Sequence, residues 1–156
     1  MWSTEEETAM TLPLHRAGAP DTETYHRVQH FYAHQMQLLD DGSVERWSET
    51  FTEDGTFAAN AHPEPTTGRG AIAEAARRAS TELARAGVVR RHWLGMVTVS
   101  TQPAGTLLAR CYALVISTPK GGQAGVHVST VCEDVLVPDG DDFLVRERRV
   151  TRDDLG

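Results

Sequence analysis

Cysteines are scarce in this chain of 156 residues, and long apolar runs are absent. The two cysteines, Cys111 and Cys132, have no metal-ligand spacing, which argues against a cysteine-based metal site. We interpret both as reduced thiols in strands of a cytoplasmic protein, although the sequence leaves a disulfide open. No apolar run approaches the length of a membrane span, and no charged-then-apolar segment of the signal-peptide kind opens the sequence.

Positive charge is also in deficit, because 15 Lys and Arg residues face 22 Asp and Glu residues and give a net charge of -7. Nucleic acids and anionic membranes attract basic surfaces, so this balance favours neither as a partner. A glycine-rich phosphate loop is missing as well, since Gly68-Arg69-Gly70 is too short to count. We find no motif for a metal or an organic cofactor, and we expect none.

The composition that remains is that of one globular domain, with 40% hydrophobic and 24% charged residues. Residues 1–20 predict a flexible N-terminal arm, because they are acidic and then contain Pro, Gly and Ala. The domain is expected at 21–153. Its first helix is predicted to begin at Asp21 or Thr22, either of which can cap it, and to end near Gly42. The buried stripe of this helix is expected to contain Val28, Phe31, Tyr32, Met36 and Leu39.

Three histidines, His26, His30 and His34, follow one another at intervals of four on the opposite side of the same helix. Histidines at this spacing can bind zinc. No glutamate ligand follows them in a recognisable pattern, so a solvated polar face is the preferred interpretation.

The rest of the chain predicts a helix-rich half followed by strands only. A short helix is expected at 43–51, a turn at 52–55, a strand at 56–60 and an alanine-rich helix at 71–86. Four long strands, at 88–101, 106–118, 124–137 and 143–151, follow at regular spacing. This order predicts an α+β domain, with about three N-terminal helices packed on a curved antiparallel sheet around a pocket.

The strand at 88–101 carries apolar side chains on both of its faces. Alternation puts Val88, Arg90, His92, Leu94 and Met96 on one face and Val89, Arg91, Trp93, Val97 and Val99 on the other. A histidine among apolar neighbours needs a hydrogen-bond partner or a function, and it supplies the first candidate for chemistry. Arg90 could bind an anionic group, but its place near the strand end favours a solvated side chain.

Two motifs carry a resemblance to a known superfamily. The first joins Leu38-Leu39-Asp40-Asp41-Gly42 to Phe51-Thr52-Glu53-Asp54-Gly55-Thr56-Phe57, and the second is Arg91-His92-Trp93. Together with the element order they resemble the NTF2-like superfamily over residues 22–152. The likeness is greatest to its SnoaL-like branch, with polyketide cyclases, scytalone dehydratase and the small subunit of ring-hydroxylating dioxygenases. The resemblance implies a cone-shaped fold around a pocket and a homodimer formed through the outer sheet face.

The resemblance also implies a catalytic pair inside the cone. The family places an aspartate at the end of the first helix and a histidine on the strand after the third helix. These positions match Asp40, rather than Asp41, and His92. The chain departs from scytalone dehydratase, because Leu39 stands where that enzyme has a tyrosine and Thr118 or a neighbour where it has a second histidine. The dehydratase reaction is therefore not carried over whole.

Five further residues are expected to bind substrate. Trp47 and Phe57 would form apolar walls for a flat aromatic molecule. His127 and Ser129 are placed inward, Ser129 because the family's pocket uses a serine there, and Tyr112 is placed inward by alternation. Each also has a structural interpretation: a lining histidine, a strand hydroxyl bonded to a neighbour, and a core tyrosine with its hydroxyl at the rim.

The leading hypothesis is a cofactor-independent cyclase or dehydratase that works by acid/base catalysis on a polyketide-derived aromatic intermediate. Its partner would be this small-molecule substrate. The alternatives are a non-catalytic small-molecule binding protein with the same pocket, and a small structural subunit of a ring-hydroxylating oxygenase beside a Rieske-iron partner.

Overall fold

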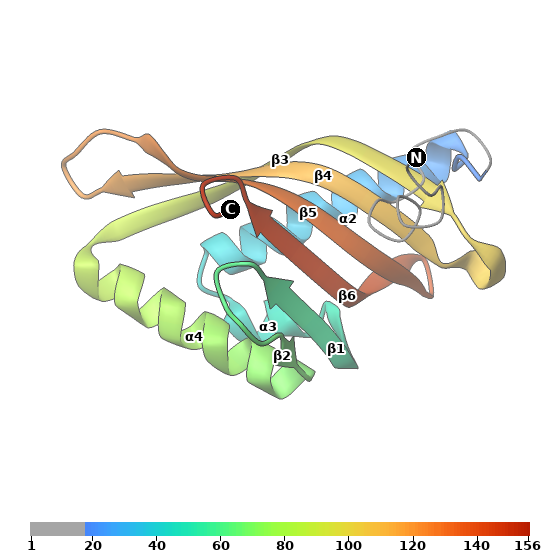
Figure 1. Cartoon of the computed structure of the whole chain (residues 1–156), viewed down its shortest axis with the longest axis horizontal. Helices are drawn as coiled ribbons and strands as arrows, with labels where there is room; N and C mark the ends of the chain where they lie inside the picture. Colours follow the sequence, from blue (N-terminus) through green and yellow to red (C-terminus); the bar gives the residue numbers. More distant parts are fainter. Residues whose placement is uncertain (1–17) are drawn as a thin grey trace.

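A computed structural model describes residues 18–156. The arm predicted for residues 1–20 therefore lies almost wholly outside the described residues. Within these residues, three helices and six strands follow one another (Figure 1). They are α2 (Thr22–Asp40), α3 (Val44–Ser48), β1 (Phe51–Ala59), β2 (Thr66–Thr67), α4 (Arg69–Ala86), β3 (Val88–Thr101), a short 3₁₀ turn η1 (Pro103–Gly105), β4 (Leu107–Pro119), β5 (Gly125–Asp139) and β6 (Asp142–Arg152). No helix of this described part is long and apolar enough to cross a membrane.

The strands form one open, curved sheet in the order β2-β1-β6-β5-β4-β3 (Figure 1). Strands β3 to β6 are an antiparallel meander, which confirms the four long strands predicted at this end of the chain. The sheet is mixed, because β1 pairs with β6 in parallel. An all-antiparallel sheet was the expectation; the parallel pair arises because the chain leaves β1 through α4 and returns to its edge only after the meander.

Helix α2 begins where its capping residue predicts. The Asp21 side chain accepts a hydrogen bond from the backbone N–H of Thr24 at 2.7 Å and satisfies one free donor of the first turn. The helix stops before Gly42, whose φ of +79° suits glycine. The predicted apolar stripe is buried in the core, with Leu39 only partly buried. His26, His30 and His34 are exposed, and no group of three His, Cys, Asp or Glu side chains within residues 18–156 is arranged to hold a metal.

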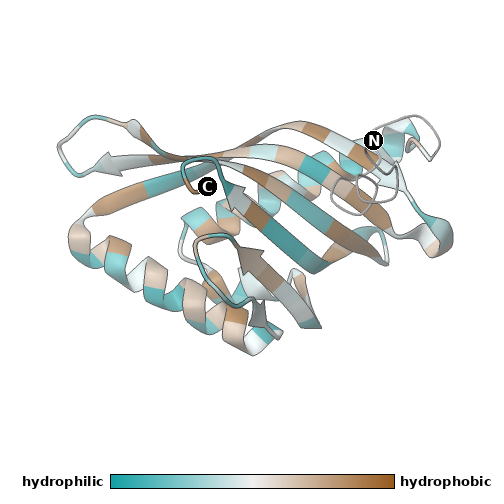
Figure 2. Ribbon diagram, viewed as in Figure 1, coloured by the Kyte–Doolittle hydropathy of each residue, from teal (hydrophilic) through white to brown (hydrophobic). Residues whose placement is uncertain are grey.

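The helices cover different parts of the sheet. Figure 1 shows α2 crossing behind the long strands, while α4 lies beside β1 and the start of β3. Apolar and polar residues alternate along the strands and along α4 in Figure 2, as expected for elements that bury one side. The end of α2, the start of β3 and α4 are thereby brought to the same end of the molecule.

A β-bulge near Met96 changes which residues of β3 face the core. Gly95 pairs with Tyr112 but Thr98 pairs with Arg110, so β3 has one extra residue at this point. Met96 has a positive φ of 53° and is 78% exposed, whereas Val97 is buried. Val99 packs against the core as well. The face assignment by strict alternation is therefore wrong beyond Gly95, because a bulge shifts the period by one residue.

The turn predicted at 52–55 is a second correction, because these residues belong to β1. The pairing of β1 with β6 shifts between Phe51 and Thr56, so the turn-forming residues make an irregular bend within the strand. A Cβ on Gly55 would come within 3.0 Å of the Thr52 carbonyl oxygen. The tight approach explains why glycine stands here.

A buried polar network, which no sequence pattern had indicated, fixes α2 to the sheet. Arg148 on β6 donates to both carboxylate oxygens of Asp134 on β5, at 2.9 and 2.8 Å, and to Gln35 Oε1 at 2.7 Å. Tyr32 donates its hydroxyl to Asp134 Oδ2 at 2.8 Å. Gln35 in turn donates to Thr50 Oγ1 at 2.7 Å. The network holds the helix that ends in Asp40 at a fixed position on the sheet.

The two cysteines face each other across β4 and β5 as Cα partners. Both are buried free thiols in this structure. A hydrogen bond with Cys111, together with burial and the nearby Asp134 carboxylate, raises the pKa of the Cys132 thiol well above its ordinary value.

Candidate active site

Asp40 and His92 contact each other although 52 positions separate them in the chain. The His92 backbone N–H donates to Asp40 Oδ2 at 3.0 Å, and ring Nδ1 lies 2.6 Å from Asp40 Oδ1. Because an ionised carboxylate can only accept, this contact assigns a proton to Nδ1. The other ring nitrogen, Nε2, is left for chemistry. The side chains are 8% exposed for Asp40 and 25% exposed for His92.

Asp40 occupies a position that helix electrostatics disfavour. It is the last residue of α2, where the helix dipole is negative, and the last turn contains no basic residue. The two donors of His92 offset this cost. Asp41 is exposed, and it caps the helix through its own backbone N–H, which donates to the Gln37 carbonyl. The structure thus brings Asp40, and not its neighbour, to the histidine.

A cavity of about 450 Å³ opens beside this pair. Its wall comes from the end of α2, from α3, β1, α4 and the start of β3, and it is mostly apolar. The lining residues are Leu39, Asp40, Asp41, Gly42, Trp47, Phe57, His62, Thr66, Ile72, Ala75, Ala76, Ala79, Ser80, Leu83, Ala84, Val88, Val89, Arg90 and His92. A concave apolar site with a few convergent polar groups is the usual form of a small-molecule pocket.

The structure brings four of the sequence-predicted residues to this cavity. Asp40, His92, Trp47 and Phe57 all line it. Trp47 on α3 and Phe51 on β1 pack edge to face with ring centroids 5.1 Å apart. This contact fixes the orientation of the Trp47 ring in the cavity wall. Part of the cavity wall next to Asp40 and His92 is therefore aromatic.

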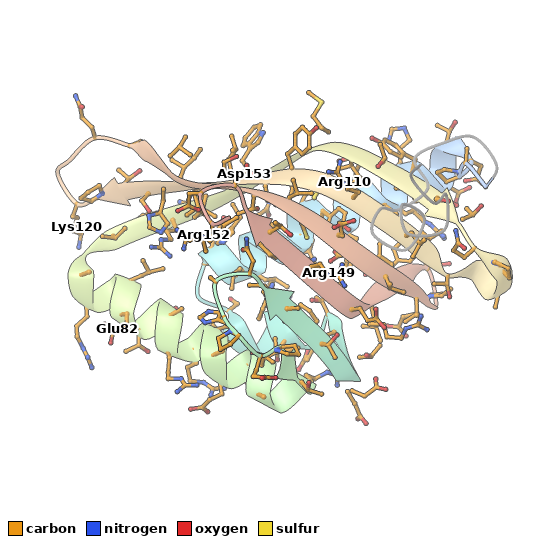
Figure 3. All side chains as sticks on the ribbon, in the orientation of Figure 1. Glu82, Arg110, Lys120, Arg149, Arg152 and Asp153 are labelled. Atoms are coloured by element: carbon orange, nitrogen blue, oxygen red, sulfur yellow. The ribbon has the colours of Figure 1, made fainter. Side chains whose placement is uncertain are left out.

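Tyr112 and Ser129 lie elsewhere, and their inward placement is corrected. Tyr112 is 51% exposed on the outer sheet face, because its neighbours Cys111 and Ala113 are the ones that point to the core. Ser129 is exposed and donates its hydroxyl to Asp153 Oδ2 at 2.6 Å. Figure 3 marks Asp153 and Arg152 at the end of β6. Neither Tyr112 nor Ser129 lines the cavity.

His127 lies outside the cavity wall, beside one of its lining residues. Val115 pairs with Val128 and Ile116 with Val126, so His127 is the extra residue of a bulge between β4 and β5. Its ring Nε2 lies 3.2 Å from Arg90 Nη2. Partial burial and then the positive charge of Arg90 lower the pKa of His127 below its ordinary value. A guanidinium can only donate, so His127 Nε2 accepts this hydrogen bond from Arg90.

Sequence reasoning missed two parts of the site. Arg90 was expected to be solvated, yet it lines the cavity. The alanine-rich helix at 71–86 was predicted without any part in the site, yet Ala76, Ala79 and Leu83 of α4 form cavity wall. A signal existed for both: Arg90 shares the His92 face of β3, and small residues at helical spacing leave room beside a helix.

The chain matches the family model of the SnoaL-like domain over residues 20–149, and it therefore belongs to the SnoaL-like family. No curated protein matches the chain. The fold agrees with this assignment, because a solved structure described as NTF2-like with a cystatin-like fold is similar to it. The family resemblance predicted from the two motifs is confirmed.

Three solved structures illustrate what the chain is similar to. Aln2 from a Streptomyces species is 32% identical with a TM-score of 0.81, covering 88% of this chain and 96% of Aln2. A protein from Catenulispora acidiphila in complex with S-DNPA is 34% identical with a TM-score of 0.71, covering 83% and 93%. The beta subunit of a putative aromatic-ring-hydroxylating dioxygenase from Novosphingobium aromaticivorans is 18% identical with a TM-score of 0.67, covering 84% and 90%, a likeness of fold alone.

Proposed function

We propose that this protein is a cofactor-independent cyclase or dehydratase, which acts by acid/base catalysis on a polyketide-derived aromatic intermediate. The observation that carries the proposal is the 2.6 Å contact between Asp40 and His92 on the wall of an apolar cavity. A carboxylate that holds an imidazole in one tautomer and stabilises its protonated form is a common acid/base arrangement.

His92 Nε2 would accept a proton from a carbon next to a carbonyl group, and the Asp40 carboxylate would stabilise the imidazolium that results. The same nitrogen would then return the proton to an oxygen. Return to a leaving hydroxyl gives dehydration, and return to the oxygen of an attacked carbonyl gives aldol cyclisation. Both outcomes use the same two side chains and differ in how the substrate is folded in the cavity.

The shape of the cavity favours a flat aromatic substrate. Trp47 and Phe57 contribute aromatic surface to the wall, and α4 contributes small side chains. A volume of about 450 Å³ suits a ligand of two or three fused rings. The relative from Catenulispora acidiphila in complex with S-DNPA supports small-molecule binding in this fold.

The test is a deuterium-exchange assay that needs no knowledge of the natural substrate. The protein is mixed with 2-naphthylacetone in D2O, and NMR follows the loss of the protons between ring and carbonyl. We expect wild-type protein to accelerate this exchange, and His92→Gln and Asp40→Asn to lose at least about 10²-fold of the acceleration. Asp41→Asn removes the same charge one residue away and should keep most of it. Folded His92→Gln with the wild-type rate would refute the assignment.

A non-catalytic binding protein is the second candidate, since the cavity and the liganded relative fit it equally well. It predicts calorimetric binding of flat aromatic ligands by wild type and His92→Gln alike, with no exchange by either. The oxygenase-subunit alternative rests on a likeness of fold alone.

We propose in addition that the chain forms a homodimer through the outer sheet face. Trp93, Met96, Tyr112 and Val126 are large apolar residues of β3, β4 and β5 that are 68%, 78%, 51% and 62% exposed. Such exposed apolar surface is typical of an interface. Replacing Trp93 and Met96 with Glu should convert a dimer to a monomer in analytical ultracentrifugation. A wild-type monomer at micromolar concentration would contradict this proposal.

A further inference from the structure

Arg90 is the only lysine or arginine among the described residues that line the cavity. It lies two positions before His92 on the same face of β3, so its Cα is roughly 7 Å from that of the histidine. Its side chain is half-buried rather than free in solvent. A permanent positive charge therefore lies two residues along β3 from His92 of the proposed acid/base pair.

The charge of Arg90 has no carboxylate partner within residues 18–156. Its Nε donates to Ser117 Oγ at 3.3 Å, and its Nη2 donates to His127 Nε2 at 3.2 Å. Both partners are uncharged acceptors, so they orient the guanidinium without neutralising it. Of the two carboxylates that line the same cavity, Asp40 is engaged by His92, and Asp41 forms no ion pair with Arg90. Arg90 is thus held in place with its charge not neutralised.

We propose that Arg90 binds the carboxylate of the substrate, which makes the substrate an aromatic acid rather than a neutral ketone. This inference rests on the proposed function, because it names the substrate class of the same cavity. A planar guanidinium matches a carboxylate through two parallel hydrogen bonds. A single arginine without a glycine-rich loop suits this singly charged planar anion better than a phosphate. The carboxylate of the substrate would then be separated from the carbon that faces His92 by about the spacing between Arg90 and His92.

The attraction between Arg90 and an anionic group would also decide which molecules enter the cavity. The chain has a net charge of -7, so an anion is repelled by the protein as a whole. A fixed, half-buried cation inside an apolar wall reverses this repulsion locally, since charges interact more strongly away from bulk water. The site would therefore select acids over their neutral amides or esters.

Isothermal titration calorimetry with 2-naphthylacetic acid and 2-naphthylacetamide tests the proposal, because the two probes have nearly the same shape and differ in charge. We expect wild type to bind the acid at least about tenfold more tightly than the amide, the range of one charge-assisted pair. Arg90→Gln should bring the ratio to within about twofold. Arg90→Lys keeps the positive charge but loses the planar group that can donate two parallel hydrogen bonds, and it should retain part of the preference for the acid.

Arg91→Gln is the matched control. It removes the same charge from the next residue, whose exposed side chain lies on the opposite face of β3, and it should leave the ratio unchanged. Equal affinity of wild type for the two probes, no binding of the acid up to millimolar concentration, or an equal loss in Arg91→Gln would overturn the proposal. Far-ultraviolet circular dichroism establishes that each variant is folded.

The preference for the acid over the amide can be measured whether or not the protein is a catalyst. His92→Gln should keep the preference for the acid while it loses proton exchange, and Arg90→Gln should lose the preference whether or not exchange occurs. A protein that exchanges protons through His92 but binds acid and amide equally would refute the role of Arg90 alone. A protein that prefers the acid through Arg90 but shows no exchange would refute the catalytic proposal alone.

Discussion

Replacing Asp40 with Asn should move a proton from one nitrogen of His92 to the other. In the wild-type protein both carboxylate oxygens accept, one from the His92 backbone N–H at 3.0 Å and one from ring Nδ1 at 2.6 Å. Asparagine has the same shape but only one acceptor, because its second terminal group is an NH2 donor. The two contacts can therefore no longer be satisfied in the same way.

The backbone N–H decides the orientation of the new amide. It cannot lose its proton, so the amide oxygen must face it, and the NH2 group then faces Nδ1. Nδ1 must become an acceptor, and the ring proton moves to Nε2, the nitrogen that is left for chemistry. The opposite orientation sets two donors against each other across 3.0 Å and costs about 1–3 kcal/mol for an unsatisfied buried group.

The expected loss of activity follows from two effects. The cavity-facing nitrogen becomes a donor and cannot take a proton, and no negative charge remains to stabilise the imidazolium. Together they should reduce proton exchange of 2-naphthylacetone by about 10²- to 10⁴-fold, or about 3–5 kcal/mol at about 1.36 kcal/mol for each factor of ten.

Long-range ¹⁵N–¹H correlation spectra of histidine-labelled protein measure the tautomer directly. We expect protonated Nδ1 and bare Nε2 for neutral His92 in wild type, and the reverse in Asp40→Asn. Asp41→Asn should leave the spectrum of His92 unchanged. If wild type shows the proton on Nε2, or if Asp40→Asn keeps both tautomer and rate, the hydrogen-bond reasoning is wrong.

Three further predictions concern groups around the site. Asp134→Ala leaves the charge of Arg148 buried without its partner and should cost about 3–5 kcal/mol in urea unfolding, whereas the exposed Asp139→Ala should cost less than about 0.5 kcal/mol; a similar effect of the two would show that the pair is not stabilising. Arg90→Gln should raise the pKa of His127 measured by NMR, though not fully to about 6.5, because partial burial is the larger cause of its depression; a fall would contradict the assigned cause. Cys111 and Cys132 should react with Ellman's reagent only after unfolding, because both are buried and the pKa of Cys132 is raised; rapid labelling of native protein would contradict this.

Local signals were sufficient to predict most of the fold. Asp21 as a capping residue and Gly42 and Gly87 as stops locate the helix ends, because each acts through its own backbone neighbourhood. The four long strands follow from alternation and from turn residues at regular spacing. The parallel pairing of β1 with β6 is a property of the whole chain path, and no local pattern contains it.

The site could be predicted only in part, because one extra residue in a strand reverses every side chain beyond it. Alternation counted from His92 is valid as far as Gly95, and the bulge near Met96 then exchanges the two faces. The same limit applies on β5, where His127 is itself a bulge residue. Asp40, His92, Trp47 and Phe57 lie before these irregularities or outside the meander, and the cavity contains all four.

Asp40 shows how a conflict with local rules can indicate function. A carboxylate at the C-terminal end of a helix is disfavoured by the dipole, and α2 has no basic residue in its last turn to compensate. The buried network of Arg148, Asp134, Tyr32 and Gln35 holds this helix rigidly on the sheet, so that the conflict is resolved by His92 and not by fraying of the helix end. A residue that weakens its own helix and is supported from elsewhere in the fold is expected at a functional site. The position of Asp40 is therefore better explained by its action on His92 than by any contribution to stability.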